Sequence, residues 1–305
     1  MRTTELKLGI VGLDGHGPVF ADIANRNSPG QDYGMRVVAA MPVDSVMISK
    51  EQLRANITKT KNLGIQILES PEDLAKGVDG ILILHDDGSM HYDLVKLFCD
   101  KGKPLFVDKP LEVSTEKASR LMELCRKAHC PVFSASSLRF TLEIQKVLEN
   151  AAGGSIISAL AYAPYVLKPT MPGWIYYGIH AVEPLYALMG TGCQKVQCLN
   201  SASGPIAIGT WKDGRMGIAR ATAKSYHGYG FTVWREKSTE VAAVDSGRIY
   251  QEMLKTIKRF FETGLTPVPL EESVEVIAFM EAANASMAKG GREMPAFPSG
   301  SKKSV

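Results

Sequence analysis

A glycine-rich turn near the start of the chain carries residue types that can hold the phosphates of a dinucleotide. Gly12 and Gly17 match the first and third glycines of the pattern G-x-G-x-x-G, whereas Asp14 stands at the middle position. The middle glycine normally lets the backbone approach a pyrophosphate at a helix N-terminus. A carboxylate about 4 Å from a phosphate would cost roughly 1 to 4 kcal/mol, although Gly15 returns part of the lost room. We therefore predict a cofactor site, with a plain tight turn as the alternative; its residues are Gly12, Leu13, Asp14, Gly15, His16 and Gly17.

The second apolar run leaves the choice of cofactor open. An acid that holds the adenosine ribose is expected about 20 residues after the glycines, where the second strand ends. Residues 35–41 are followed by Pro42 and Val43, and Asp44 comes two or three positions later than expected. No arginine follows immediately to hold a 2′-phosphate. NAD and NADP are both compatible with this sequence.

A lysine follows another short apolar run, in the order Asp108-Lys109-Pro110. A lysine at the carboxyl edge of a strand faces the ligand crevice of a doubly wound sheet. Pro110 fixes the backbone beside it, and we predict a cis peptide bond at this point. Lys109 is thus a candidate for contact with a ligand, and a surface lysine in a turn is the alternative.

Two carboxylates and two histidines lie within seven residues, in His85-Asp86-Asp87-Gly88 and His91. Such residue types also occur in metal sites, but no partner ligands recur at helical spacing elsewhere in the chain. We therefore predict no metal. The remaining alternatives are a solvated loop and, for His91, the first turn of a helix.

Alternating strands and helices over about 135 residues must position these groups. Short apolar runs fit strands that are buried on both faces, as parallel strands are, and amphipathic stripes fit the helices between them. This alternation predicts a doubly wound parallel sheet. The predicted strands are 6–11, 35–41, 65–68, 80–84, 105–107 and 132–134, and the predicted helices are 18–27, 52–63, 91–101 and 115–129.

The pattern changes after about residue 148. Successive strands are predicted at 155–166, 195–202, 206–211, 215–224 and 228–234, with Asp213-Gly214 as a hairpin turn. Two helices, 250–263 and 273–289, follow. The sequence thus predicts a Rossmann domain over 1–135, an α+β domain with a mostly antiparallel sheet over 136–295, and a flexible tail over 296–305 rich in Pro, Ser and Lys.

Composition limits the class of protein. A chain of 305 residues with 45% hydrophobic and 22% charged residues fits two globular domains. A net charge of +3 without a basic block argues against a nucleic-acid partner, and the apolar runs are far shorter than the roughly 20 residues that cross a bilayer. Five cysteines without a Cys-x-x-Cys pair, and no signal-peptide core, predict a cytoplasmic location.

Four motifs in order resemble the Gfo/Idh/MocA oxidoreductases, named for glucose–fructose oxidoreductase, inositol dehydrogenase and a rhizopine-catabolism protein. The motifs are the turn 12–17, Asp108-Lys109-Pro110, the segment 131–140 that ends in Arg139-Phe140, and the segment 173–181 that contains His180. The resemblance covers nearly the whole chain. It implies a Rossmann domain that binds NAD or NADP, and an open-faced antiparallel sheet used for substrate and for assembly into a homodimer or homotetramer.

The resemblance also implies roles for individual residues. Asp108 stands where the family has the glutamate of Glu-Lys-Pro, Lys109 matches the catalytic lysine, and His180 matches the catalytic or substrate-positioning histidine. The family places a loop along the cofactor at the position of His85 and Asp86. In the implied reaction a sugar or polyol hydroxyl loses its proton as hydride passes to the nicotinamide. The substrate pocket would be shaped by Arg139, Trp174, Tyr176, Tyr177 and His180.

Two departures keep other functions open. Tyr176 stands where the enzymes usually have an aspartate, four residues before His180, and the usual glycine pair upstream is reduced to Gly173. A tyrosine cannot replace an aspartate as a ready proton acceptor, although it can donate a hydrogen bond. The alternatives to an oxidoreductase are a binding or sensor protein with the same fold, and a lyase or epimerase with a retained nicotinamide. His180 could also be a satisfied histidine on a buried helix, and Trp174, Tyr176 and Tyr177 could be core or interface aromatics.

Overall fold

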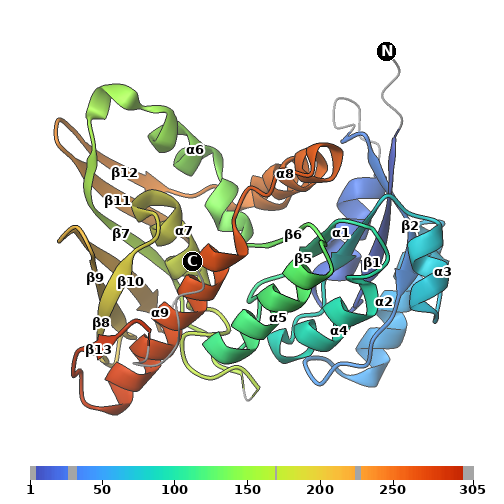
Figure 1. The fold of residues 1–305 in the computed structure, drawn as a ribbon, viewed down its shortest axis with the longest axis horizontal. Helices are drawn as coiled ribbons and strands as arrows, with labels where there is room; N and C mark the ends of the chain where they lie inside the picture. Colours follow the sequence, from blue (N-terminus) through green and yellow to red (C-terminus); the bar gives the residue numbers. More distant parts are fainter. Residues whose placement is uncertain (1–4, 27–32, 169, 224–227, 298–305) are drawn as a thin grey trace. The chain divides into compact units, whose positions relative to one another are not determined.

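The computed structural model describes residues 5–26, 33–168, 170–223 and 228–297. The chain forms two compact units (Figure 1). The first comprises Met1–Glu112, Glu116–Ala135 and Tyr250–Leu270, and the second comprises Val113–Thr115, Ser136–Ile249 and Glu271–Val305. Each unit has its own sheet.

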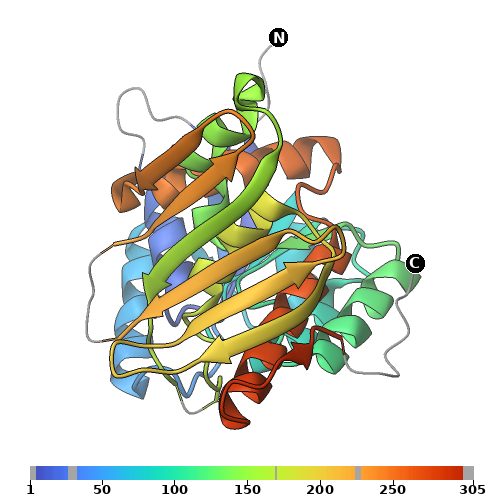
Figure 2. The same ribbon diagram turned by 90° about the vertical axis from the view of Figure 1, so that its left-hand side faces the viewer.

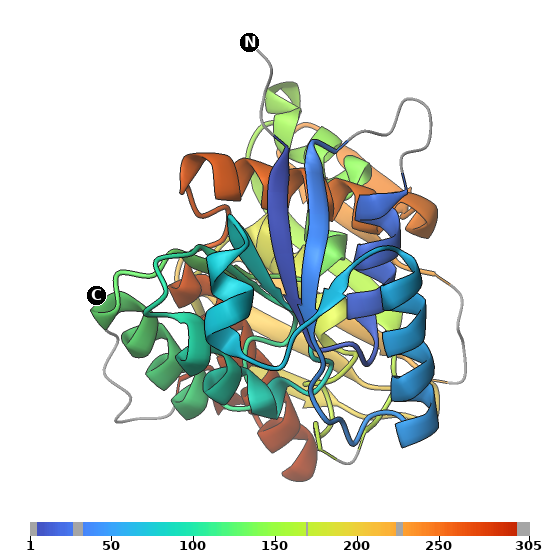
Figure 3. The same ribbon diagram turned by 90° about the vertical axis from the view of Figure 1, so that its right-hand side faces the viewer.

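The first unit contains a six-stranded sheet in the order β3-β2-β1-β4-β5-β6, in which all pairs are parallel. Figure 3 shows β1 and β2 side by side. Apolar runs such as Gly-Ile-Leu-Ile in β4 are buried throughout, as a parallel sheet covered on both faces requires. The strands are β1 (Leu6–Val11), β2 (Met35–Met41), β3 (Gln66–Ile67), β4 (Gly80–Ile83), β5 (Leu105–Val107) and β6 (Val132–Ser134).

Side-chain caps begin several helices of the first unit. Ser49 accepts a hydrogen bond from the backbone N–H of Gln52, and Ser70 accepts one from that of Asp73 in a helix that starts with Pro71. The helices are α1 (His16–Asn25), α2 (Lys50–Asn62), α3 (Pro71–Lys76), α4 (His91–Phe98) and α5 (Thr115–Lys127), with a short 3₁₀ turn η1 at Gly88–Met90.

Helix α8 (Ile249–Thr263) returns to the first unit from far along the chain. Its Phe260 ring lies 5.0 Å from that of Phe133, and its Tyr250 ring lies 5.5 Å from that of Phe20. The sequence predicts this helix in the second domain, because it follows the antiparallel strands. The structure corrects that assignment for residues 250–270, since the apolar face of α8 packs on the Rossmann core.

The second unit contains a seven-stranded sheet in the order β12-β11-β7-β10-β9-β8-β13, in which only the β7–β10 pair is parallel among the described strands. The strands are β7 (Ile156–Pro164), β8 (Cys193–Leu199), β9 (Ile206–Trp211), β10 (Met216–Thr222), β11 (Gly230–Arg235), β12 (Thr239–Ala243) and β13 (Met294–Pro295). The helices are α6 (Leu142–Glu149), α7 (Ile179–Met189) and α9 (Leu270–Ala288), with 3₁₀ turns η2 (Ser137–Phe140), η3 (Ala151–Gly153) and η4 (Ser246–Arg248).

Small side chains on one face of this sheet let α7 pack closely. Ala159 and Ala161 of β7 and Ala219 of β10 are completely buried, and a Cβ on Gly217 would lie 3.1 Å from the side chain of Leu185 in α7. The side chains that alternate with them are half-buried or exposed. Figure 2 looks onto that other face, which no described helix of the unit crosses. The sheet is therefore open on one side.

The structure confirms the predicted fold class, an α/β Rossmann sheet with a second, mostly antiparallel sheet. Helices α3, α6 and α7 and strands β12 and β13 had not been predicted. The predicted tail starts too early, because Ala296 is buried and its N–H donates to the carbonyl of Gln194; residues 298–305 lie outside the described part. Within the described residues, every helix is too short or too polar to span a lipid bilayer.

Candidate functional site

The glycine turn has the backbone of a phosphate-binding loop. Gly12 has a φ of +91°, and a Cβ there would lie 2.7 Å from the backbone nitrogen of His85. A Cβ on Gly17 would lie 2.2 Å from the carbonyl oxygen of Gly12. Both positions therefore require glycine, and α1 begins directly after the turn at His16. A dinucleotide loop uses its glycines in this way.

Asp14 is buried, and its carboxylate connects the loops after β2 and β4 through hydrogen bonds. Its carboxylate accepts hydrogen bonds from the Ser45 hydroxyl at 2.7 Å and from the backbone N–H of Asp86 at 3.1 and 3.2 Å. Asn56 of α2 donates to the backbone carbonyls of Leu13 and Asp14. The side chain at the middle position of the glycine pattern is thus turned toward the loops that follow β2 and β4.

Asp86 lies against the first turn of α1. Its carboxylate accepts a hydrogen bond of 3.4 Å from the N–H of His16, and a Cβ on Gly15 would lie 1.9 Å from its Oδ2 atom. Burial raises the pKa of Asp86, and the negative charge of Asp14 adds to this, while His16 opposes it. The carboxylate therefore occupies the end of the helix at which backbone N–H groups attract an anion.

His16 and Asp108 form an ion pair. The His16 Nδ1 atom lies 2.6 Å from Asp108 Oδ2, and Tyr250 bonds the His16 Nε2 atom at 3.2 Å. Burial by itself lowers the pKa of His16, but Asp108 more than offsets this, so the pKa is raised above 6.5. Burial alone would raise the pKa of Asp108, but the charge and hydrogen bond of His16 hold it well below its usual range.

Lys109 is buried beside this pair, directly after β5. The Lys109–Pro110 peptide bond is cis, as the sequence predicts. His91 bonds the carbonyls of Pro110 at 2.8 Å and His85 at 2.7 Å, and Gly88 packs so closely that a Cβ would lie 2.7 Å from the Pro110 ring. The loop after β4 thus holds the backbone that carries Lys109.

The histidines after β4 have structural partners. His85 is buried, its Nε2 lies 3.1 Å from the carbonyl of Asp44, and its Nδ1 accepts from the N–H of Asp87. The one group of possible metal-binding side chains within the described residues is His16, Asp86 and Asp108. The two closest of these atoms are His16 Nδ1 and Asp108 Oδ2, and their separation of 2.6 Å is that of a hydrogen bond.

His180 is the second residue of α7 in the other unit. It is buried, and its Nδ1 atom lies 2.8 Å from the hydroxyl of Ser136, which also accepts from the N–H of Leu138. The ring of Tyr177 lies 4.7 Å away and that of Tyr229 5.9 Å away, both edge-on. His180 is thus held by a hydroxyl and enclosed by two aromatic rings.

The tyrosines of this group are connected. The hydroxyls of Tyr177 and Tyr229 lie 3.0 Å apart, and the Tyr176 ring lies 5.8 Å from that of Tyr177. Lys168 places its ammonium 5.7 Å from the centre of the Tyr176 ring. Tyr177 and Tyr229, whose rings lie beside His180, are half-buried and carry the two paired hydroxyl groups.

Arg139 and Trp174 are enclosed by protein. The Arg139 guanidinium bonds Glu183 at 2.6 Å and Glu272 at 2.5 Å. Burial by itself lowers the pKa of Arg139, but the two carboxylates outweigh this and raise it. Trp174 is completely buried, which favours the alternative of a core aromatic over a residue that shapes the substrate pocket. Both residues therefore have structural partners in the second unit.

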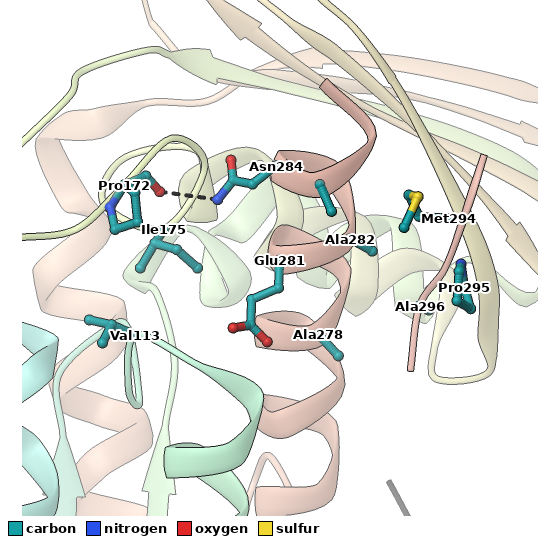
Figure 4. A pocket seen from close by; sticks show the side chains of 11 residues that line it. Val113, Pro172, Ile175, Ala278, Glu281, Ala282, Asn284, Met294, Pro295 and Ala296 are labelled. Atoms are coloured by element: carbon teal, nitrogen blue, oxygen red, sulfur yellow. Dashed lines mark hydrogen bonds between the residues drawn. The ribbon is translucent and has the colours of Figure 1, made fainter. Parts of the chain in front are cut away.

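A cavity of about 450 Å³ is lined in part by Pro172 and Ile175, which precede His180 in the chain (Figure 4). Asn284 of α9 accepts from the N–H of Trp174 at 3.0 Å and donates to the carbonyl of Pro172 at 3.2 Å. These hydrogen bonds fix the position of the backbone segment that leads to Tyr176 and Tyr177. The lining residues are Val113, Pro172, Ile175, Ala278, Glu281, Ala282, Asn284, Ala285, Met294, Pro295 and Ala296.

Sequence reasoning missed Ser136, Tyr229 and Tyr250. Tyr250 reaches His16 from 234 residues along the chain, and Ser136 reaches His180 from 44 residues away. No local motif marks such partners. Ser136 alone had a signal, since it lies in the segment 131–140 that carried the family resemblance.

The residues of the first unit fit a dinucleotide. The two glycine positions admit no side chain, and α1 has no acid in its own first turn. Gly12 to Gly17 would hold the pyrophosphate, and Lys109 lies after β5 at the carboxyl ends of the strands, where such sheets bind ligands. The Asp86 carboxylate lies at this helix end, where it accepts a hydrogen bond from the N–H of His16.

Comparison with known proteins supports this assignment. Residues 6–136 match the model of the Gfo/Idh/MocA oxidoreductase family, which is described by an NAD-binding Rossmann fold. A sequence comparison with curated proteins finds no match.

Several solved structures share the fold over nearly the whole chain. A scyllo-inositol dehydrogenase from Lactobacillus casei, solved with NAD(H) and scyllo-inositol, has a TM-score of 0.77 at 14% identity, covering 95% of this chain and 99% of its own. A myo-inositol dehydrogenase from Corynebacterium glutamicum has a TM-score of 0.79 at 16% identity, with coverages of 96% and 99%. A probable dehydrogenase from Thermotoga maritima has a TM-score of 0.78 at 19% identity, with coverages of 95% and 99%.

At these identities the solved structures establish the fold, and the family model carries the assignment to a class of protein. That model covers the glycine turn, Asp86, Asp108 and Lys109. Residues 6–136 therefore match the NAD-binding Rossmann domain of the Gfo/Idh/MocA oxidoreductase family, and the solved structures extend the likeness in fold to nearly the whole chain.

Proposed function

We propose that this protein is an NAD-dependent dehydrogenase that oxidises a secondary alcohol of a polyol or sugar. The observation that carries the proposal is Lys109, which is buried directly after β5 in the same unit as a glycine turn that fits a dinucleotide. A cyclic polyol is the first substrate class to test, because the solved structures with this fold include inositol dehydrogenases.

In the proposed reaction the alcohol loses a proton and a hydride and becomes a ketone. Gly12 to Gly17 would hold NAD⁺, which would supply the hydride acceptor. The Lys109 ammonium would donate a hydrogen bond to the reacting oxygen and stabilise the negative charge that develops there. Burial of the lysine strengthens this interaction, because the surroundings screen charge less than water does.

His180 would take the proton of the alcohol. A neutral imidazole can act as a base near neutral pH, since its ordinary pKa is about 6.5. If the Nδ1–H of His180 donates to the Ser136 hydroxyl, the lone pair is on Nε2. Tyr177 and Tyr229 would then donate hydrogen bonds to the other hydroxyl groups of a polyol. Arg139 would act indirectly, by holding Glu183 and the start of α7 in place.

The proposal makes the protein an intracellular enzyme that acts as a homodimer or homotetramer on a small molecule. Five free thiols, four of them buried, support a reducing compartment. A binding protein of the same fold and an epimerase with retained nicotinamide remain the alternatives. A turnover assay distinguishes both from a dehydrogenase. A binding protein shows no turnover, and an epimerase converts substrate without net reduction of added NAD⁺.

The test is NAD⁺ reduction at 340 nm with a panel of inositols, sugars and linear polyols. Lys109→Ala should lower kcat by about 10²- to 10⁴-fold while the melting temperature stays near that of the wild type. Exposed Lys96 of α4 provides the matched control, because Lys96→Ala removes the same charge elsewhere on the unit. Equal turnover in Lys109→Ala and the wild type would refute the role of Lys109, and turnover by neither with any substrate would favour a binding protein.

A further inference from the structure

We propose that the Asp86 carboxylate is a resident anion, which means that it occupies the phosphate site when no cofactor is bound. The cofactor binds only when this carboxylate becomes protonated or moves away. The inference rests on the proposed function, because it concerns how the same site takes NAD(H). It assigns to Asp86 the control of cofactor affinity.

The position of the carboxylate carries the inference. Asp86 Oδ1 accepts from the N–H of His16, the first residue of α1, and Asp86 Oδ2 lies 1.9 Å from where a Cβ of Gly15 would be. Gly15 precedes the helix and lies within the glycine turn. A bound pyrophosphate uses this turn and this helix end. The carboxylate and the phosphate thus require the same donors.

Hydrogen bonds hold the backbone of Asp86 in position. Its N–H donates to both oxygens of the buried Asp14 carboxylate, and the next residue, Asp87, bonds the ring of His85. The departure from the glycine pattern at Asp14 therefore has a function in the structure: it anchors the loop that brings Asp86 to the helix.

The charges around Asp86 come from three elements. Asp14 lies in the turn after β1, His16 in α1, and Asp108 and Lys109 after β5. His16 and Lys109 stabilise the Asp86 anion, while burial, Asp14 and Asp108 oppose it, and the pKa of Asp86 is raised as a result. A further negative phosphate would oppose the anion more strongly. Cofactor binding should therefore be coupled to uptake of a proton at Asp86.

Below the pKa of Asp86 the carboxyl is neutral and does not repel the phosphate, so the cofactor binds more tightly. As the pH rises above that pKa, the neutral fraction falls tenfold per pH unit and the affinity declines. Protonation of His16 acts in the same direction, so a variant that removes the Asp86 charge alone is needed to separate the two groups.

The experiment measures the Kd of NADH by fluorescence between pH 5.5 and 8.5 for the wild type and Asp86→Asn. Asparagine keeps the shape of the side chain and removes the charge. Asp93→Asn, on exposed Asp93 of α4, is the matched control. At pH 8 Asp86→Asn should bind NADH about tenfold or more tightly than the wild type, and Asp93→Asn should bind like the wild type. Calorimetry in buffers of different ionisation enthalpy should show proton uptake that Asp86→Asn reduces.

The outcomes separate this inference from the proposed function. Tighter binding by Asp86→Asn supports the resident anion, including the case in which the wild type fails to bind at pH 8. Equal or weaker binding by folded Asp86→Asn, with a wild type that binds NADH, overturns this inference alone. Binding of NADH or NADPH by none of the three proteins at any pH overturns the proposed function together with the inference.

Discussion

At the scale of residues, three aspartates near the glycine turn have three different tasks. Asp14 joins loops, Asp86 lies at the helix end, and Asp108 pairs with His16. From the sequence, Asp14 looks like an obstacle to a phosphate. In the structure the Asp14 carboxylate points toward Ser45 and the loop after β4. The carboxylate that lies at the helix end, where a phosphate would bind, is that of Asp86. A motif shows which residue departs from the pattern, but not where its side chain goes.

Asp14→Ala should destabilise the first unit. The Ser45 hydroxyl and the Asp86 N–H would lose their buried acceptor, which costs about 1 to 3 kcal/mol. Thermal denaturation followed by circular dichroism measures the change. Ser45→Ala removes only one of these bonds and should cost less. An unchanged melting temperature for Asp14→Ala would contradict the structural role.

The His16–Asp108 pair predicts how stability depends on pH. The pKa of His16 is raised, so its contribution is present below about 6.5 and is lost as the pH rises through the folded value. The pKa of Asp108 is lowered, so its contribution is present above about 3.8 and is lost only as the pH falls through a lower value. The pair is therefore strongest between these limits.

His16→Gln should accordingly lower the melting temperature more at pH 5.5 than at pH 9. Measurements at both pH values on wild type and variant give the difference directly. A penalty that is the same at the two pH values would mean that the contact stabilises as a neutral hydrogen bond.

At the scale of elements, Arg139 connects η2 to α7 through Glu183 and to α9 through Glu272. Burial raises the pKa of Glu183, while Arg139 opposes this. Removing the arginine leaves Glu183 charged and unpaired in the interior, and the loss of one partner of a buried pair costs about 3 to 5 kcal/mol. The network is thus expected to hold the helix that carries His180.

Arg139→Met should destabilise the second unit by about that amount, and Arg139→Met with Glu183→Met should recover part of the loss. All three tryptophans lie in this unit, so urea denaturation followed by tryptophan fluorescence reports on it selectively. A double variant no more stable than Arg139→Met would show that the cost comes from lost packing.

The elements differ in how well the sequence predicts them. Five strands have the predicted bounds, namely β1, β2, β5, β6 and β9. The first four belong to the parallel sheet, where buried strands are short apolar runs. Helix α7 was missed because it is apolar on nearly all sides and contains Pro184, so it has no amphipathic stripe. Strand β12 alternates between half-buried and exposed residues and carries little apolar signal.

At the scale of the whole molecule, the open face of the seven-stranded sheet predicts assembly. Met216 and Trp234 are exposed and pair in register with the same residue, Ser158 of β7. Ile208, Ile218 and Leu160 lie in one row across neighbouring strands of that face. An apolar face of this kind is expected to be covered by a second copy of the chain.

Light scattering on the eluting protein should therefore give the mass of a dimer or tetramer. Met216→Glu combined with Trp234→Glu should shift the mass toward a monomer, because the charges would be buried without partners. A monomeric wild type at micromolar concentration would contradict the prediction.

Function at this scale is only partly visible in the sequence. The resemblance to the family rests on motifs whose spacing is local, such as Gly12 to Gly17 and Asp108-Lys109-Pro110. The contacts that tune the site, such as Tyr250 with His16 and Ser136 with His180, join distant parts of the chain. Only the folded backbone brings such partners together.

The most direct test of the central claim is a thermal-shift titration of the purified protein with NAD⁺, NADH, NADP⁺ and NADPH at pH 6 and pH 8. A ligand at 100 times its Kd stabilises the folded state by about 2.7 kcal/mol, which is readily detected. We predict a clear shift with NAD⁺ or NADH that is larger at pH 6. No shift with any of the four at either pH would contradict the assignment as a nicotinamide-dependent enzyme.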